Sequence, residues 1–235
     1  MTDSRVCIAL DFQTKEEVKQ FLSKFNDESL YVKVGMELFY GEGIEMIKMI
    51  KEMGHNIFLD LKLHDIPNTV KSAMKQLAKL DVDMVNVHAS GSIAMMKAAL
   101  EGLEEGKVGN KRPLCIAVTC LTSLDQEVLD NELLIHESLE NVVLKWAKNT
   151  KEAGLDGIVC SPLESKLIHE QLGQQFLTVT PGIRLVEDSV DDQKRVTTPA
   201  LARELTSSYI VVGRTITGAK DPAATYKKVY ADFQG

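Results

Sequence analysis

The sequence lacks the features that mark membrane-spanning, secreted and nucleic-acid-binding proteins. No run approaches the roughly 18 consecutive apolar residues that cross a bilayer, and the first residues, MTDSRVCIALD, lack the basic and apolar regions of a signal peptide. The formal net charge is -7 and no long run of lysine and arginine occurs, which argues against a surface for nucleic acid or an anionic membrane. We therefore expect a cytoplasmic protein with neither a nucleic-acid nor a membrane partner.

Closely spaced cysteine pairs are also absent. The four cysteines, Cys7, Cys115, Cys120 and Cys160, never occur as CxxC, and three of them lie in apolar runs. Zinc sites and disulfide frameworks usually show local ligand pairs, so neither is expected. We interpret the cysteines as reduced core residues, and a catalytic role for Cys120 is not favoured.

Short apolar runs recur through the 235 residues and predict strands. The eight candidate strands are Val6 to Leu10, Leu30 to Val34, Ile57 to Leu61, Met84 to Val87, Leu114 to Val118, Gly157 to Cys160, Phe176 to Val179 and Tyr209 to Val212. Helical patterns separate most of them, with apolar residues at every third or fourth position, as in 44–53 and 70–80. Strand and helix therefore alternate throughout.

This alternation predicts an α/β protein, specifically a closed (β/α)8 or TIM barrel. The chain shows no composition break, Ser/Gly linker or low-complexity tract, so residues 1–235 are expected to form a single domain. A doubly wound open sheet is the alternative. It is less favoured because no strand leads into the GxGxxG motif that such sheets use for dinucleotides.

Polar residues gather where the predicted strands end, which is the end of a barrel that carries catalytic groups. They are Asp11 in ALD, Lys33 in VKVG, Asp60 and Lys62 in LDLK, and Asn86 and His88 in NVHAS. Side chains alternate across a strand, so Asp60 and Lys62 should share one side. Lys33 on the neighbouring strand can approach Asp60, and Asp65 lies just beyond the strand end. Four charges of alternating sign would tolerate a burial that a lone charge does not.

Two simpler interpretations of these charges remain. They could form salt bridges on a solvated rim, or Asp60, His64 and Asp65 could bind a divalent metal. Two lysines in the same group would repel a cation, so no metal site is expected. Carboxylates beside a lysine favour its protonated form. Lys62 is then better suited to donate a proton than to form a Schiff base, which needs a neutral amine.

A phosphate site is predicted after the last two strands. TPGIR, residues 180–184, follows strand seven, and VVGRTIT, residues 211–217, follows strand eight, where barrels frequently bind phosphate. Gly182 and Gly213 allow backbone N–H groups to approach phosphate oxygens, and Arg184 or Arg214 can supply a bidentate fork. The alternative is that these glycines only form ordinary turns, since glycine is common after a strand.

The segment between these motifs is long and polar for a loop of a barrel. Residues 185–199, LVEDSVDDQKRVTTP, show no clear periodicity, and we interpret them as a lid over the site. Its acidic residues would repel a phosphate. Gln193, Lys194 and Arg195 are therefore the members expected to face the ligand.

Taken together, DxKxxD in FLDLKLHDIPNTV, VKVG before it, and TPGIR and VVGR after it resemble the bacterial form of the orotidine 5'-phosphate decarboxylase family, along essentially the whole chain. The resemblance implies a (β/α)8 carboxy-lyase that converts orotidine 5'-monophosphate to UMP and CO2, the last step of de novo pyrimidine nucleotide biosynthesis. It also implies that neither cofactor nor metal is used. The active sites would form at the interface of a homodimer.

The resemblance further implies a role for each matching residue. Lys62 would donate the proton within the array Lys33, Asp60, Lys62 and Asp65. Asp65 and Thr69 would reach into the partner subunit's site, and Asp11 and Lys33 would hold ribose hydroxyls. The remaining substrate-binding residues would be Thr122 and Ser123 for the pyrimidine, Arg184, Gln193, Gly213 and Arg214 for the phosphate, and Pro181 beside them.

Two rival functions are compatible with parts of this pattern. Decarboxylases and aldol-type synthases of the same superfamily act on keto-sugar phosphates, share DxKxxD and hold magnesium, but they place a glutamate where this sequence has Lys33. A barrel that binds a phosphate ligand without chemistry is the second rival, and the complete set of charges argues against it.

Overall fold

The computed structural model describes residues 4–25, 28–186 and 196–235. Within them, eight parallel strands form a closed barrel in chain order, each hydrogen-bonded to the next and the last to the first. The strands are β1 (Val6–Ala9), β2 (Tyr31–Gly35), β3 (Asn56–Leu63), β4 (Met84–His88), β5 (Leu114–Val118), β6 (Gly157–Val159), β7 (Leu177–Thr180) and β8 (Tyr209–Val212). The predicted (β/α)8 barrel is confirmed.

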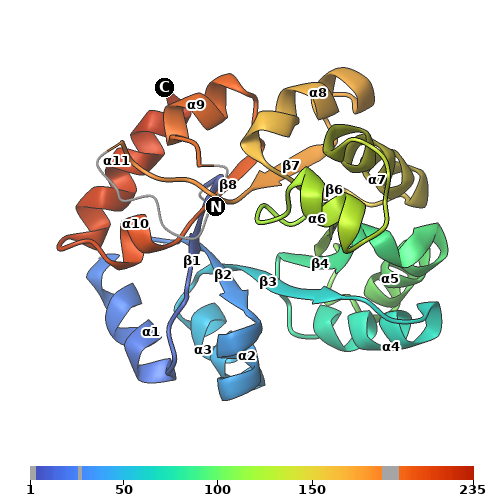
Figure 1. Ribbon diagram of the computed structural model, residues 1–235. Coiled ribbons are helices and arrows are strands. Elements are labelled where there is room, and N and C mark those ends of the chain that lie inside the picture. The colour runs from blue at the N-terminus through green and yellow to red at the C-terminus, as the bar shows by residue number, and fades with distance from the viewer. Residues whose placement is uncertain (1–3, 26–27, 187–195) are drawn as a thin grey trace.

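Helices surround the strands, and Figure 1 shows them following one another around the barrel from blue α1 to red α11. They are α1 (Lys15–Leu22), α2 (Met36–Glu42), α3 (Ile44–Glu52), α4 (Pro67–Ala78), α5 (Ser92–Gly106), α6 (Gln126–Asn131), α7 (Leu139–Ala153), α8 (Pro162–Leu172), α9 (Pro199–Glu204), α10 (Arg214–Thr217) and α11 (Pro222–Gln234), with 3-10 turns η1 (Ser23–Phe25) and η2 (Ala89–Gly91). No described helix has both the length and the apolar character needed to cross a membrane.

Successive residues of a strand point to opposite faces, so a strand can supply side chains to two apolar cores. In β1, Val6 and Ile8 pack in the large core that includes buried residues of the helices, whereas Cys7 and Ala9 belong to a smaller cluster of strand residues. That second cluster is Cys7, Ala9, Tyr31, Phe58, Met84, Ile116, Val179 and Val211. It fills the inside of the barrel and forms the floor on which the site lies.

All four cysteines are buried, and none of them forms a disulfide within the described part of the chain. Cys7 lies in β1 and Cys115 in β5, while Cys120 and Cys160 follow β5 and β6. Burial raises the pKa of the Cys115 thiol to about 12 and also raises the pKa of Cys7. These thiols are therefore protonated near neutral pH, as expected for core residues rather than nucleophiles.

Candidate functional site

The period of two along the strands places three polar side chains at the C-terminal end of the barrel interior. Lys33 lies two residues after Tyr31, Asp60 two after Phe58, and Asn86 two after Met84. Since Tyr31, Phe58 and Met84 point into the barrel, the polar residues form the next layer above them. The sequence thus builds a polar layer directly on an apolar floor.

Asp60 joins two lysines in this layer. Its Oδ1 lies 2.7 Å from Lys62 Nζ, and its Oδ2 lies 3.5 Å from Lys33 Nζ. Lys33 Nζ is also 3.6 Å from Asp11 Oδ1. The side chains of Asp60 and Lys33 are only 12% and 14% exposed. We refer to Asp11, Lys33, Asp60 and Lys62 as the charge cluster, whose formal charges sum to zero.

The charge cluster keeps its buried members ionised. Burial by itself would lower the pKa of Lys33, but the carboxylates of Asp60 and Asp11 outweigh burial and raise that pKa. Burial would likewise raise the pKa of Asp60, but Lys33, Lys62 and the hydrogen bond from Asn86 lower it. Opposite charges and hydrogen bonds therefore prevail over desolvation at both residues.

Asp65 lies outside this cluster in the single chain. Its carboxylate accepts a hydrogen bond from the backbone N–H of Ile66 at 2.6 Å and is exposed to solvent. Among the described residues it forms no ion pair with Lys33 or Lys62, so Asp11 completes the array that was expected to contain Asp65. Thr69, in the first turn of α4, is also exposed.

Simple strand alternation does not explain why Lys62 lies beside Asp60. Lys62 has a φ of 51°, in the left-handed region, and the pairing of β3 with β4 shifts register between Leu59 and Leu63. The two side chains were expected together on a regular strand, but a β-bulge brings them together. Bulges next to active sites commonly redirect a side chain.

Asn86 is a buried polar residue of the site to which the sequence pattern assigns no role. Its amide contacts both Asp60 and the backbone of Lys62. The signal was present in MVNVH, where a single amide interrupts an apolar strand two residues after Met84, just as Lys33 and Asp60 follow Tyr31 and Phe58 by two residues. This pattern predicts a polar strand end but does not by itself place Asn86 in the site.

A cavity of about 330 Å3 opens above the charge cluster. Six of its lining residues were predicted to bind substrate or act in catalysis: Lys33, Asp60, Lys62, Thr122, Ser123 and Pro181. The other six are apolar and were not predicted individually: Phe58, Val118, Cys120, Leu121, Val159 and Val211. The cavity combines a charged edge with an apolar wall, as expected of a pocket for a small organic ligand.

The described residues that are predicted to bind phosphate follow the neighbouring strands β7 and β8, beside this cavity. Gly182 follows β7 with a φ of 79°, and Gly213 follows β8 so close to Asp11 that an added Cβ would lie 3.4 Å from its Oδ2. Arg184 is half-buried, with Nη1 donating to the carbonyl of Ile183 at 3.0 Å, and Arg214 is exposed at the start of α10.

Only the base of the expected lid falls within the described residues. The N–H of Thr197 donates to the carbonyl of Gly182 at 3.0 Å, and the N–H of Arg184 donates to the carbonyl of Thr197, also at 3.0 Å. This pairing fixes both ends of the segment beside the predicted phosphate site. Gln193, Lys194 and Arg195 lie outside the described residues.

The alternative of a metal site at Asp60, His64 and Asp65 finds no support in the geometry. In the part of the chain that the structure describes, no group of three or more His, Cys, Asp and Glu side chains is arranged to hold a metal ion. His64 instead faces His88, with ring centroids 5.5 Å apart. Asp60 is shared between two ammonium groups, which repel a cation.

A larger cavity, of about 670 Å3, lies at the opposite end of the barrel. It is lined by residues at the starts of strands, including Tyr31, Asn56, Leu114 and Tyr209, and by none of the charge cluster. Catalytic groups of (β/α)8 enzymes lie at the C-terminal ends of the strands. The smaller cavity is therefore the candidate active site.

Comparison with known proteins places this geometry in a family. Residues 4–229 match the family model described as orotidine 5'-phosphate decarboxylase / HUMPS family. The chain is 62% identical over 229 residues to proteins named orotidine 5'-phosphate decarboxylase from Bacillus mycoides and Bacillus cytotoxicus, covering 97% of this chain and 96% of each relative.

Solved structures agree over nearly the whole chain. Orotidine 5'-phosphate decarboxylase from Lactobacillus acidophilus has a TM-score of 0.89 and 46% identity, covering 98% of this chain and 99% of that one. An uncharacterized conserved protein from Geobacillus kaustophilus has a TM-score of 0.88 and 49% identity, covering 97% of this chain and 99% of that one. The chain belongs to the orotidine 5'-phosphate decarboxylase / HUMPS family.

Proposed function

We propose that the charge cluster carries out the decarboxylation of orotidine 5'-monophosphate (OMP) to UMP and CO2, the last step of UMP biosynthesis. The observation that carries this proposal is the position of Lys62, whose ammonium group is held by Asp60 at the edge of a cavity with an apolar wall. The relatives at 62% identity bear the name of this carboxy-lyase.

The reaction requires positive charge at one carbon of the pyrimidine ring. Loss of CO2 leaves an electron pair on that carbon with no π-system into which it can spread. The ammonium group of Lys62 stabilises this developing charge and then transfers its proton to the same carbon. The C–C bond supplies the electron pair, and a C–H bond to the former Lys62 proton replaces it, so the step balances without an oxidant or reductant.

Asp60 contributes by holding Lys62 and by repelling the substrate carboxylate. Two unit charges about 4 Å apart repel by about 4 kcal/mol at an effective dielectric constant of about 20, which corresponds to roughly three powers of ten in rate. Decarboxylation needs a barrier reduction on the order of 20 kcal/mol. Transition-state stabilisation by Lys62 and binding of the remote phosphate must therefore supply most of it.

The remaining predicted residues bind the nucleotide. Asp11 and Lys33 hold the ribose hydroxyls, and Thr122, Ser123 and Pro181 surround the pyrimidine. The phosphate is bound by Arg184, Gln193, Gly213 and Arg214. The proximity of Gly213 to Asp11 supports this arrangement, because it brings the predicted phosphate and ribose residues together.

We further propose that the reaction uses no metal and no cofactor. The magnesium-dependent enzymes of the superfamily are not favoured, because Lys33 occupies the position of their metal-binding glutamate and places a second ammonium group beside Asp60. The protein is proposed to act in the cytoplasm as a homodimer in which Asp65 and Thr69 complete the partner subunit's site. Their exposure at the mouth of the barrel supports this.

The test is the loss of ultraviolet absorbance of the orotate ring when the purified protein meets OMP with EDTA present throughout. Rapid loss with UMP as the product is the expected result. A flat trace with EDTA that becomes active on addition of magnesium would favour the metal-dependent branch. A flat trace from folded protein under both conditions would contradict the proposed function.

A further inference from the structure

The strand that carries Lys62 is irregular at the catalytic position. Phe58 and Leu59 of β3 pair with Met84 and Val85 of β4, but the next pair is Leu63 with Val87. Three residues of β3, Asp60 to Lys62, therefore lie opposite Asn86 alone. Within this bulge Lys62 has a φ of 51°, a conformation that side chains other than glycine, asparagine and aspartate seldom adopt.

The side chain of Asn86 fills the gap that the bulge leaves in the hydrogen-bond ladder. Asn86 is 1% exposed. Its Nδ2 donates to Asp60 Oδ1 at 2.7 Å, and its Oδ1 accepts from the backbone N–H of Lys62 at 2.8 Å. The carboxylate only accepts and the N–H only donates, so these contacts also fix which way round the amide lies.

These contacts form a closed ring with the catalytic lysine. Asp60 Oδ1 receives Lys62 Nζ at 2.7 Å as well as the Asn86 amide. Asn86 therefore holds Lys62 at its backbone directly and at its ammonium group through Asp60. Removing the amide would leave the partly buried N–H of Lys62 and one carboxylate lone pair of Asp60 without these partners.

We propose that Asn86 is a positioning residue for the decarboxylation: it holds the Lys62 backbone in its left-handed conformation and fixes the orientation of Asp60, so that the Lys62 ammonium group points at the reacting carbon. The inference rests on the proposed role of Lys62 as the proton donor. It predicts that loss of the Asn86 amide lowers kcat but has little effect on the binding of UMP, which lacks the leaving carboxylate.

Two substitutions separate this role from ordinary core packing. Asn86→Leu has a similar volume and removes both hydrogen bonds. We expect kcat to fall on the order of 100-fold, because small displacements of a catalytic group cost this much, while the dissociation constant for UMP changes by less than about threefold. Both are measured by the orotate absorbance assay and by UMP titration.

Asn86→Asp gives a pH signature that a packing defect does not produce. The new carboxylate would face Asp60 and repel it, but in its protonated form it donates to Asp60 and still accepts from Lys62 N–H. The kcat of Asn86→Asp relative to wild type should therefore recover as the pH is lowered from about 9 to about 6. Asn86→Leu carries no titratable group, and its ratio to wild type should stay constant.

Thr150→Val is the matched control for loss of a buried hydrogen bond. Thr150 lies in α7, fully buried, with its hydroxyl donating to the carbonyl of Trp146 at 2.7 Å. This variant should lose thermal stability and retain wild-type kcat. If Asn86→Leu does not fold, the pH profile of Asn86→Asp decides the question.

A kcat for Asn86→Leu within about threefold of wild type, or a UMP affinity that falls in parallel with kcat, would overturn the positioning role. So would a loss in Asn86→Asp that does not vary with pH. The underlying function is tested separately in the same assay. If wild-type protein does not convert OMP, or if Lys62→Ala converts it at a near-normal rate, the proposed function itself fails.

Discussion

At the scale of single residues, the site depends on the ammonium group of Lys33, which stays charged although it is largely withdrawn from water. Lys33 achieves this through Asp60 and Asp11, which together raise its pKa against the effect of burial. Lys62 is held by Asp60 at 2.7 Å. A buried lysine without such partners would tend to lose its proton, and with the proton it would lose the ability to stabilise a carbanion.

Removing the Lys62 amine should abolish turnover but not nucleotide binding. We expect Lys62→Ala to lower kcat on the order of 10⁴-fold or more, because both charge stabilisation and proton donation are lost. UMP should still bind, since the ribose and phosphate residues are unchanged. Steady-state kinetics and UMP titration measure the two effects. Lys48→Ala, at an exposed ion pair with Glu45, is the control and should behave as wild type.

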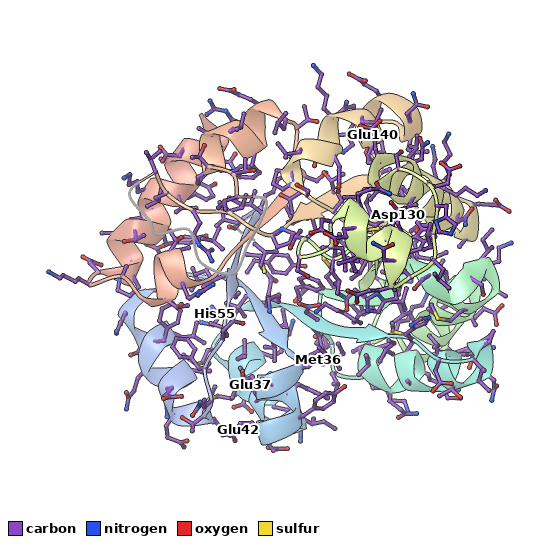
Figure 2. All side chains as sticks on the ribbon, viewed as in Figure 1. Met36, Glu37, Glu42, His55, Asp130 and Glu140 are labelled. Carbon is purple, nitrogen blue, oxygen red and sulfur yellow. The ribbon has the colours of Figure 1, made fainter. Side chains whose placement is uncertain are left out.

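A second residue-scale prediction concerns His55, which is labelled in Figure 2. The ring is 5% exposed, and its Nδ1 accepts from the backbone N–H of Leu30 at 3.2 Å. Its Nε2 has no hydrogen-bond partner among the described residues. Burial lowers the pKa of His55, so the folded protein favours the neutral ring. The unfolded chain, with a histidine pKa of about 6.5, binds the proton first.

Stability should consequently decrease as the pH falls below about 6.5, until the lower pKa of the folded state is reached. The slope from this one residue is at most about 1.4 kcal/mol per pH unit. His55→Asn retains an acceptor for Leu30 and cannot titrate, so its melting temperature should vary less with pH. His136→Asn, at an exposed position, should retain the wild-type pH dependence. Equal slopes for wild type and His55→Asn would contradict the prediction.

At the scale of whole elements, the barrel could be predicted because its strands are short apolar runs separated by helical patterns. Observed strand boundaries differ from the expected ones by at most two residues, and those of β5 and β8 agree at both ends. The largest extension is in β3, which continues to Leu63 rather than stopping at Leu61. The added residues include a bulge, in which the backbone N–H of Lys62 donates to the side chain of Asn86 on β4. The alternation of side chains along one strand does not predict a hydrogen bond from the side chain of another strand.

The site was predictable to the extent that it follows from neighbouring strands. Lys33 meets Asp60 because β2 and β3 are adjacent in the sheet. Asp65 follows the strand end and turns away with the start of α4, so sequence proximity to Lys62 did not bring it into the cluster. The roles proposed for Asp65 and Thr69 depend on a second subunit, whose position no single sequence specifies.

Helix packing at α4 and α5 yields an element-scale prediction. A Cβ added to Gly102 of α5 would overlap the backbone carbonyl of Lys71 in α4. Since backbone atoms cannot rotate away, Gly102→Ala should force the helices apart and destabilise the fold by about 1–3 kcal/mol, despite the higher helix propensity of alanine. Urea denaturation measures this.

Gly41→Ala in α2 is the matched control for that substitution. An added Cβ there has nothing within 4 Å, so only the helix propensity changes. Its stability should rise by up to about 1 kcal/mol. Unchanged or increased stability of Gly102→Ala would show that the two helices do not depend on this close approach.

At the scale of the whole molecule, the face around the barrel mouth carries three exposed apolar side chains. Met36, labelled in Figure 2 on α2, is 43% exposed, Tyr40 is 70% exposed and Ile66 is 66% exposed. They follow β2 and β3, the strands that carry Lys33 and Lys62, and Ile66 adjoins Asp65. Exposed apolar side chains beside a functional site commonly mark a protein interface. This supports the proposal that a second copy of the chain covers this face.

A subunit-mixing experiment tests whether the partner completes the site. Lys62→Ala and Asp65→Ala should each be inactive as homodimers. In a mixed dimer, the subunit carrying Asp65→Ala retains its own Lys62 and receives an intact Asp65 from its partner, so that one of the two sites is complete. With random exchange, half of the dimers are mixed and about one site in four should be active. Orotate absorbance measured after verified subunit exchange gives the fraction.

If Asp65 served its own subunit instead, every mixed dimer would contain only defective sites, one lacking Lys62 and the other Asp65. No activity would then return, even though exchange had occurred. Mixing Lys62→Ala with Lys33→Ala provides the contrast, because both residues lie in the charge cluster of one chain and neither subunit can supply the other's loss. Recovery in the first mixture together with none in the second would assign Asp65 to the partner's site, since only a residue that crosses the interface can be supplied by another subunit.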